Sequence, residues 1–520
     1  MELKIDLKGS SMKKLPLGIS TFSKIIEEDY LYIDKTEIVL DLLENSQYVF
    51  LSRPRRFGKS LFLDTLQNIF QAKKEYFKNL YIYDRYDWSQ SYPVINISFA
   101  SGRLESREAL DERVLGILRD NHKSLDVECE ERDNVSRCFK DLIEKAYEKY
   151  NQKVVILIDE YDKPLLDNIE DTITAKEMRD GLVNFYSVIK GSDAFIRFVF
   201  ITGVSKFSKV SIFSGLNNMQ DISLDRRYGN ICGYTQKDIE QSFLPYLKGV
   251  DIDKLKEWYN GYNFLGDKVY NPYDILLFID GGYLYKNYWF ETGTPTFLIH
   301  LLKQRNYFIP QLEHLIVDEG LINSFDIEKI KLETVLFQAG YLTIDTVGQT
   351  RRGALEYRLR LPNKEVMLSL NDMFIDYLTD ERSLRIQDRL YDSLYDGNVE
   401  NLKTTLISLF ASIPYNNYVK NTISSFEGYY ASVIYAYLAS LGIEIIAEDV
   451  TNRERIDLTI KLGSYIYILE FKVGSQDALA QIRSKKYHQK YLEKDKTLFL
   501  VGINFDEEHK NIKQFEYDRV

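Results

Sequence analysis

One stretch decides the fold of the N-terminal half of this 520-residue chain: Gln47-Tyr48-Val49-Phe50-Leu51-Ser52-Arg53-Pro54-Arg55-Arg56-Phe57-Gly58-Lys59-Ser60. Its first six residues are mostly apolar, which is typical of a short buried strand, and apolar residues at helical spacing follow from Leu61 to Phe70. Gly58-Lys59-Ser60 therefore falls in the turn between a strand and a helix. Backbone N–H groups in such a turn surround phosphates, a lysine reaches the β- and γ-phosphates, and a hydroxyl binds Mg²⁺.

This combination predicts an ATP site in a phosphate-binding loop, or P-loop. The expected nucleotide contacts are Arg56, Phe57, Gly58, Lys59, Ser60 and Leu61. One residue departs from the full pattern G-x-x-x-x-G-K-[ST], because Arg53 stands at the position of the first glycine. An arginine there could leave the loop functional on a different backbone path, or it could weaken or abolish nucleotide binding.

A second apolar run, Val154-Val155-Ile156-Leu157-Ile158, ends at two acidic residues. A carboxylate at the end of a neighbouring strand can hold Mg²⁺ through water, and an adjacent one can orient the attacking water. We therefore expect Asp159 to share the Mg²⁺ ion with Ser60 and expect Glu160 to be the catalytic base. Thr202 or Ser205, just past a strand at 196–201, is the expected polar sensor of the γ-phosphate.

Each motif is common when taken alone, since G-K-S occurs by chance and D-E often marks only a solvated strand end. Their order along the chain, with strand 93–98 between them, is what favours the ATPase interpretation. Strands and helices alternate over residues 1–225, which predicts an α/β domain with the parallel sheet of P-loop NTPases. A helical lid or extension is expected over 226–325, a winged-helix-like module over 326–370 and a helical connector over 371–425.

The C-terminal residues 426–520 are predicted to form a separate α/β unit. The expected order is helix 426–441, strands 443–449, 456–461 and 464–471, helix 477–491 and strand 497–503. Asp457 opens one strand and Glu470-Phe471-Lys472 ends the next, and residues i and i+2 of a strand share a face. Two carboxylates that hold Mg²⁺ beside a lysine that stabilises developing charge indicate a phosphodiesterase. Glu427 could add a third carboxylate, and Gln481 could orient the site.

A basic cluster follows this candidate site. Arg483, Lys485 and Lys486 are predicted to contact the phosphates of nucleic acid, and the alternative is an ordinary solvated helix face. The carboxylate–lysine pattern D…E-x-K also occurs in many hairpins. An inactive fold that only binds nucleic acid and a plain surface hairpin therefore remain as alternatives.

Several motifs in order resemble the AAA-ATPase-like family of bacterial proteins over most of residues 10–300. They are Leu15-Pro16-Leu17-Gly18, Tyr32-Ile33-Asp34-Lys35-Thr36, the loop Arg53–Ser60, Asp159-Glu160-Tyr161-Asp162-Lys163-Pro164-Leu165, Gly203-Val204-Ser205-Lys206, Trp258-Tyr259-Asn260-Gly261-Tyr262 and Tyr288-Trp289-Phe290-Glu291-Thr292-Gly293. That family also has R-P-R-R-F-G-K-S as its loop, and the resemblance implies binding of ATP and Mg²⁺ at the matching positions.

Residues 426–505 resemble the PD-(D/E)XK nuclease superfamily, whose domain often follows the ATPase in the family above. Asp457, Glu470 and Lys472 match its motif, while Ile456 stands where the pattern has proline. The resemblance implies a restriction-endonuclease-like α/β fold.

The overall charge and the cysteines limit the other possibilities. A net charge of −11 excludes a nucleic-acid footprint over the whole surface but allows a local basic groove. Cys129, Cys138 and Cys232 lack metal-ligand spacing, as do the scattered histidines, so we expect no zinc site and a reduced compartment. The N-terminus lacks a secretory h-region and no apolar run reaches the ~18 residues of a membrane span. The expectation is a cytoplasmic protein without membrane contact, and an oligomer is possible.

The sequence therefore predicts an ATP-binding and ATP-hydrolysing protein coupled to a Mg²⁺-dependent nuclease-like domain that acts on DNA. The alternative is a nucleotide-dependent regulatory switch whose C-terminal fold is a non-catalytic binding platform.

Overall fold

The structure is a computed structural model that describes residues 12–130, 133–206, 218–289, 312, 315–323, 330–379, 384–413, 427–451, 454–474, 476–492, 495–506 and 508–520. The chain forms two compact units. The first comprises Met1–Gly293 with Val317–Tyr357, and the second comprises Thr294–Ile316 with Arg358–Val520. Within the described ranges, no helix is both long and apolar enough to cross a bilayer.

A five-stranded parallel sheet forms the centre of the first unit, in the order β2-β3-β4-β1-β5. Its strands are β1 (Tyr48–Ser52), β2 (Val94–Ser98), β3 (Val154–Asp159), β4 (Ile196–Gly203) and β5 (Gln220–Asp221). In β3 and β4 nearly every side chain is buried, as expected for strands that are covered on both faces. The parallel sheet predicted for the P-loop domain is thus present.

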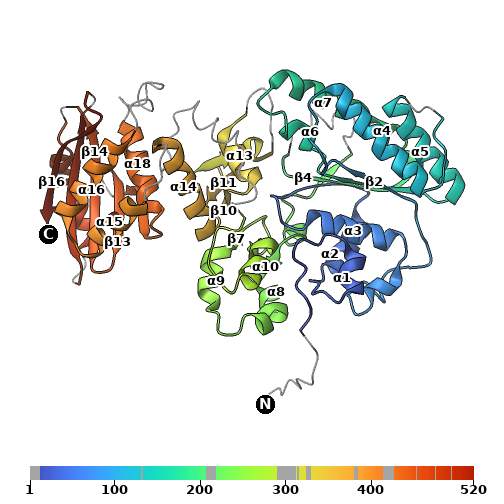
Figure 1. Ribbon diagram of the computed structural model, residues 1–520, viewed down its shortest axis with the longest axis horizontal. Coiled ribbons are helices and arrows are strands. Elements are labelled where there is room, and N and C mark those ends of the chain that lie inside the picture. The colour runs from blue at the N-terminus through green and yellow to red at the C-terminus, as the bar shows by residue number, and fades with distance from the viewer. Residues whose placement is uncertain are drawn as a thin grey trace, which may run out of the picture. The chain divides into compact units, whose positions relative to one another are not determined.

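Helices cover both faces of this sheet, with α4, α5 and α7 on one side and α1, α2 and α3 on the other (Figure 1). Their bounds are α1 (Phe22–Glu27), α2 (Thr36–Asn45), α3 (Lys59–Phe70), α4 (Arg107–Ser124), α5 (Val135–Tyr150), α6 (Lys163–Leu166) and α7 (Thr172–Gly191). Along the chain β2 lies between the two nucleotide motifs, but in the sheet it is β4 that separates β1 from β3. The P-loop strand and the acidic strand are therefore next-nearest neighbours.

The rest of the first unit is mainly helical and also contains a small antiparallel sheet in the order β6-β8-β7. These strands are β6 (Tyr234–Thr235), β7 (Asn260–Tyr262) and β8 (Val269–Tyr270). The helices are α8 (Gln236–Asp238), α9 (Ile252–Tyr259), α10 (Pro272–Asp280), α12 (Glu319–Asn323) and α13 (Leu332–Ala339). After α13 come β10 (Thr343–Gln349) and β11 (Leu355–Arg360), the helix–strand–strand order predicted for 326–370.

The second unit contains a five-stranded mixed sheet in the order β12-β13-β14-β15-β16, in which only β14 and β15 are parallel. Its strands are β12 (Glu444–Val450), β13 (Arg455–Leu462), β14 (Tyr465–Val473), β15 (Thr497–Asp506) and β16 (Asn511–Arg519). Its helices are α14 (Lys364–Thr379), α15 (Leu384–Tyr395), α16 (Val399–Ser412), α18 (Glu427–Ala439) and α19 (Ala478–Lys485).

Two features of this unit differ from the sequence prediction. The helix expected over 477–491 ends at Lys485, because Lys486 adopts a left-handed φ of 55° and a 3₁₀ turn follows at Tyr487–Tyr491. The edge strand β16 was not predicted, because in its polar sequence only Phe515 is buried and no apolar alternation marks it.

Candidate nucleotide and nuclease sites

The P-loop connects the end of β1 to the start of α3 through two left-handed residues. Arg56 has a φ of 70° and Gly58 a φ of 91°. A Cβ atom added at Gly58 would meet nothing within 4 Å, so glycine is needed there for its backbone conformation and not for space. Arg53 is not among the residues with positive φ, so the first position of the pattern does not require glycine in this loop.

Lys59 and Ser60 begin α3 and face the acidic end of β3. The Lys59 ammonium donates hydrogen bonds to the carbonyl oxygens of Arg53 at 2.9 Å and Pro54 at 3.0 Å. Burial lowers the pKa of Lys59, while the nearby Asp159 acts in the opposite direction. The Ser60 hydroxyl donates to Oδ2 of Asp159 at 2.6 Å. The predicted Mg²⁺ ligands thus lie together, and their oxygen donors fit a hard cation.

A cleft of about 520 Å³ opens beside these residues, a size that suits a nucleotide. Its lining includes charged residues, among them Lys59, Glu160, Asp162 and Lys163. The remainder is more apolar and includes Pro16, Ile19, Tyr234, Tyr273 and Leu276. Sequence reasoning did not assign this part, although Pro16 lies in the N-terminal motif quoted for the family resemblance. Of the predicted contacts, Arg56, Gly58, Lys59, Ser60 and Leu61 line the cleft.

Phe57 is buried on the other side of the loop, where its ring contacts Tyr262 and Phe264 edge-on. Its contribution is therefore to hold the loop against β7 and the segment that follows it. Thr202 is also fully buried, and its hydroxyl donates to the Leu51 carbonyl of β1 at 2.9 Å. Thr202 does not line the cleft, so its side chain is committed to the sheet and not to a phosphate.

Glu160 follows the last residue of β3 in a left-handed conformation with a φ of 52°. Its side chain lines the cleft, and burial together with the neighbouring Asp159 raises the pKa of its carboxyl. A raised pKa brings a carboxylate closer to the range in which a general base is effective.

Asp162 is the functional-site residue that the sequence analysis missed. It is 1% exposed, and its carboxylate accepts backbone N–H groups of Val204 at 3.1 Å and Ser205 at 2.5 Å. Burial raises the pKa of Asp162 to about 6, although the hydrogen bond from Ser205 opposes the shift. A Cβ atom at Gly203 would lie 2.4 Å from the Asp162 carboxylate, so only glycine allows this approach. The signal in the sequence that could have identified Asp162 is its position only three residues after Asp159.

Arg53 points away from the nucleotide cleft. Its guanidinium is 1% exposed and donates to the carbonyl oxygens of Ser223 at 2.7 Å and Tyr228 at 3.2 Å. It also lies over the Phe264 ring, 4.0 Å from the centroid. Burial lowers the pKa of Arg53 to about 10, so it is cationic at neutral pH. The Arg53 side chain therefore leaves the nucleotide cleft clear. This geometry agrees with the first alternative for Arg53, a functional loop on a different backbone path.

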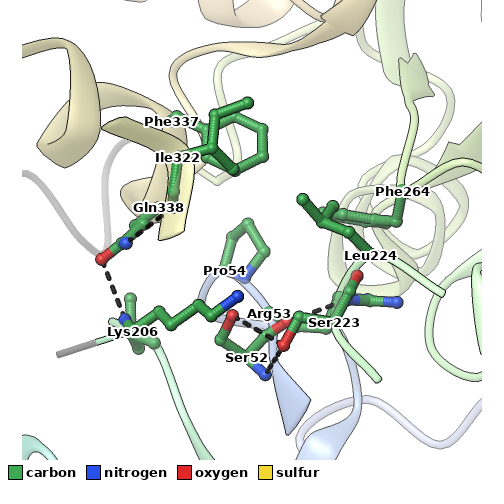
Figure 2. Close-up of a pocket in the computed structure, with 11 residues that line it drawn as sticks. Ser52, Arg53, Pro54, Lys206, Ser223, Leu224, Phe264, Ile322, Phe337 and Gln338 are labelled. Atoms are coloured by element: carbon green, nitrogen blue, oxygen red, sulfur yellow. Dashed lines mark hydrogen bonds between the residues drawn. The ribbon is translucent and has the colours of Figure 1, made fainter. Parts of the chain in front are cut away.

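A small cavity of about 20 Å³ lies behind the P-loop, with room for about one water molecule (Figure 2). Ser52, Arg53 and Pro54 form one side, and Phe337 and Ile322 lie opposite them. Beside the cavity, the Gln338 side chain of α13 accepts the backbone N–H of Lys206 at 2.9 Å (Figure 2). The helix α13 is therefore attached to the loop that follows β4.

The second candidate site lies on the β13–β14 hairpin. Leu458 pairs with Leu469, which places Asp457 beside Glu470 on adjoining antiparallel strands. The Lys472 ammonium donates to Oε1 of Glu470 at 3.0 Å and to the Phe471 carbonyl at 2.8 Å. Oδ2 of Asp457 accepts the Phe471 N–H at 2.8 Å. The structure thus brings together the three predicted residues, and the two carboxylates are a donor set that Mg²⁺ accepts.

The helix α19 adds a further contact to this site. Gln481 donates a hydrogen bond to Oε1 of Glu470 and lies 3.4 Å from the Tyr487 hydroxyl. Gln481, which was expected to orient the site, thus contacts the Glu470 carboxylate directly. Glu427 is the first residue of α18, but its side chain lies outside the described part of the chain.

The predicted basic cluster is largely paired with acidic side chains. Arg483 forms a two-pronged ion pair with Asp518, at 2.6 Å and 2.7 Å, and Lys485 pairs with Glu454. Lys486 is exposed at the end of α19. The structure therefore places Arg483 and Lys485 in surface pairs, which are individually weak and can exchange partners.

The fold and the two sites define a protein with an AAA-ATPase-like domain and a PD-(D/E)XK nuclease superfamily domain. The family described as "Predicted AAA-ATPase" matches residues 16–213, and the PD-(D/E)XK nuclease superfamily matches residues 425–515. The chain is also 46% identical, over 514 residues, to an uncharacterized protein in the vnfD 5' region of Azotobacter chroococcum mcd 1. The match covers 97% of this chain and 99% of that protein, so the chain belongs to the same family.

Proposed function

We propose that this protein binds and hydrolyses ATP in its first unit and uses it to control a Mg²⁺-dependent nuclease in its C-terminal domain, with DNA as the substrate. The observation that carries the ATPase proposal is the 2.6 Å contact of Ser60 with Asp159 beside the 520 Å³ cleft. The nuclease proposal rests on Asp457, Glu470 and Lys472, which meet on adjoining strands.

In the ATPase cleft, Lys59 exchanges the carbonyl oxygens of its own loop for the β- and γ-phosphates. Bound Mg²⁺ neutralises phosphate charge, and Ser60 and Asp159 are the residues that hold it. Glu160 orients the attacking water and accepts its proton. The apolar end of the cleft, at Pro16, Ile19 and Tyr273, accommodates the base. Ser205, whose backbone N–H donates to the Asp162 carboxylate, is the polar sensor of the γ-phosphate.

In the C-terminal domain, Asp457 and Glu470 hold the metal ion, which supplies an activated water and Lewis acidity. Gln481 keeps Glu470 in place, and Lys472 stabilises negative charge that develops at the scissile phosphate. Arg483, Lys485 and Lys486 contact the nucleic-acid backbone, the first two by exchanging Asp518 and Glu454 for phosphates. Because their carboxylate partners offset part of the charge, Lys486 makes the larger contribution to binding.

The test is cleavage of linear, circular and single-stranded DNA with Mg²⁺ or Mn²⁺, with and without ATP. Lys472→Ala should abolish cleavage and leave ATP hydrolysis intact. Lys461→Ala is the matched control, because Lys461 lies on β13 of the same hairpin and pairs with Glu444 at 2.7 Å, away from the site. Cleavage that survives in Lys472→Ala would contradict the nuclease assignment.

The same assay tests the coupling and the alternative function. A response of cleavage to ATP that disappears in Glu160→Gln would support coupling between the two activities. Hydrolysis of ATP without cleavage under any condition would instead favour the regulatory switch, with the C-terminal fold as a non-catalytic binding platform.

A further inference from the structure

Three residues with metal-ligating side chains meet in the first unit, outside both sites described above. His122 lies in the last turn of α4, Cys129 in the following loop and Cys138 near the start of α5. One ligand atom from each lies within 4.8 Å of the other two. The Cys138 sulfur is 3.7 Å from Nε2 of His122 and 2.8 Å from the Cys129 sulfur.

The environment of this cluster is that of a protected site. His122 is 5% exposed and Cys138 is 1% exposed, while Cys129 is partly buried. Nδ1 of His122 is buried and has no hydrogen-bond partner among the described residues. The other ring nitrogen, Nε2, faces the Cys138 sulfur at 3.7 Å, so the imidazole is directed toward the thiol pair.

The loop that carries Cys129 is already held against α5 by hydrogen bonds. The Glu130 N–H donates to Asp141 at 2.8 Å, and the Lys145 ammonium donates to the Glu128 carbonyl at 2.9 Å. The N–H of Val127 donates to the carbonyl of His122 itself at 2.9 Å. Cys129 therefore faces Cys138 without the help of an ion, so the ligand set is preformed.

We propose that His122, Cys129 and Cys138 form a zinc site that joins α4 to α5. Two thiolates and an imidazole are a donor set that selects Zn²⁺ over the hard cations expected at the two carboxylate sites. Tetrahedral bonds of ~2.3 Å to sulfur and ~2.05 Å to nitrogen imply S···S of about 3.8 Å and N···S of about 3.6 Å. The nitrogen–sulfur distance fits, and the sulfurs separate by about 1 Å around the ion. Water fills the fourth position.

The site would stabilise the attachment of α4 to the central sheet. Asn121, the neighbour of His122, accepts the Asn96 N–H of β2 at 2.8 Å and donates to the Asn96 carbonyl at 2.7 Å. An ion that fixes His122 to Cys138 therefore ties this edge of the sheet to α5. The expected role is structural, since the nucleotide cleft is lined by other residues.

The test is titration of the reduced, full-length protein with Co²⁺ and then Zn²⁺. We expect one Co²⁺ per chain with a thiolate-to-cobalt charge-transfer band, which carboxylate sites do not produce, and displacement of Co²⁺ by Zn²⁺. Cys129→Ala and His122→Gln should each weaken binding at least ~100-fold, more than the ~10–100-fold typical of residues that only support a ligand. Cys232→Ala is the matched control, because this third thiol lies beside the P-loop and should leave the band unchanged.

A second readout covers the structural role and does not depend on catalysis. Removal of Zn²⁺ with a chelator should lower the melting temperature of wild type and of Cys232→Ala, but not of Cys129→Ala. The proposal is overturned if no charge-transfer band forms or if Cys129→Ala retains it. It is also overturned if intact mass shows that Cys129 and Cys138 remain joined as a disulfide under the reducing conditions, which would make them a redox pair.

Discussion

Replacing Arg53 by glycine restores the first glycine of the pattern G-x-x-x-x-G-K-[ST], yet we expect it to damage the protein. The substitution removes the donor of the Ser223 and Tyr228 carbonyls, and each buried acceptor left without a partner costs ~1–3 kcal/mol. Glycine adds ~0.5–1 kcal/mol of backbone entropy. Loss of the contact with Phe264 adds to this, and removal of a buried charge offsets part of it. The net destabilisation should be about 3–5 kcal/mol.

The assay is the melting temperature of the full-length protein without nucleotide. With an unfolding entropy of ~2.1 cal/mol/K per residue, a loss of ~4 kcal/mol lowers the melting temperature of a unit of about 330 residues by about 6 °C. Arg56→Gly is the matched control in the same loop. Arg56 is exposed, has a φ of 70° and lies over Tyr273, so glycine there should change stability by less than ~1 kcal/mol.

Arg53→Lys separates the charge from the geometry. A lysine keeps the cation but cannot donate in a fixed fork to two carbonyl groups, so its melting temperature should fall between those of wild type and Arg53→Gly. The reasoning is refuted if Arg53→Gly melts no lower than Arg56→Gly. It is also refuted if Arg53→Gly binds an ATP analogue more tightly than wild type.

Three further predictions follow from buried and exposed charges and from close packing. Burial raises the pKa of Asp162 from 3.8 to about 6. The stability that comes from the protonated carboxyl group is therefore complete below pH ~4 and is lost as the pH rises through 6. Asp162→Asn should flatten this pH dependence in melting temperatures measured from pH 4 to 8. Gly502→Ala would place a Cβ atom 2.4 Å from the backbone nitrogen of Leu479. Urea unfolding should therefore show the second unit destabilised by ~1–3 kcal/mol. An unchanged urea midpoint would contradict this close packing. Lys486→Ala should reduce the slope of log K against log salt for DNA binding by ~1. Arg483→Ala should reduce the slope by less, because Asp518 already offsets the charge of Arg483. Equal slopes for the two variants would argue against this difference.

The sequence was sufficient to predict the elements that build the two sites. Gly58, Lys59 and Ser60 lie between a strand and a helix as their spacing required. Asp457 and Glu470 meet because hairpin register follows from the alternation of side chains along two strands. In both cases short-range periodicity determines which residues share a face.

What the sequence could not provide is the path of long or buried side chains. The pattern places Arg53 at a loop position, but its partners Ser223 and Tyr228 lie about 170 residues away along the chain. Thr202 was expected just past a strand at 196–201, but β4 continues to Gly203, and the Thr202 hydroxyl turns to β1 because β4 lies next to β1 in the sheet.

The spacing of residues along the sequence likewise did not indicate the thiol–imidazole cluster of His122, Cys129 and Cys138. Six residues separate His122 from Cys129 and eight separate Cys129 from Cys138, which matches no familiar ligand pattern. The residues meet only because the chain reverses between α4 and α5, and the backbone hydrogen bonds that fix this reversal leave no periodic trace in the sequence.

The attachments of α13 have a mechanical consequence. The C-terminal end of this helix touches the P-loop, where a Cβ atom at Gly340 would lie 2.8 Å from Pro54, and two residues earlier the Gln338 side chain accepts the backbone N–H of Lys206. The helix therefore connects two loops that follow different strands, the P-loop after β1 and the loop after β4. A change in the distance between those loops must therefore break the Gln338 hydrogen bond, open the contact of Gly340 with Pro54 or move α13.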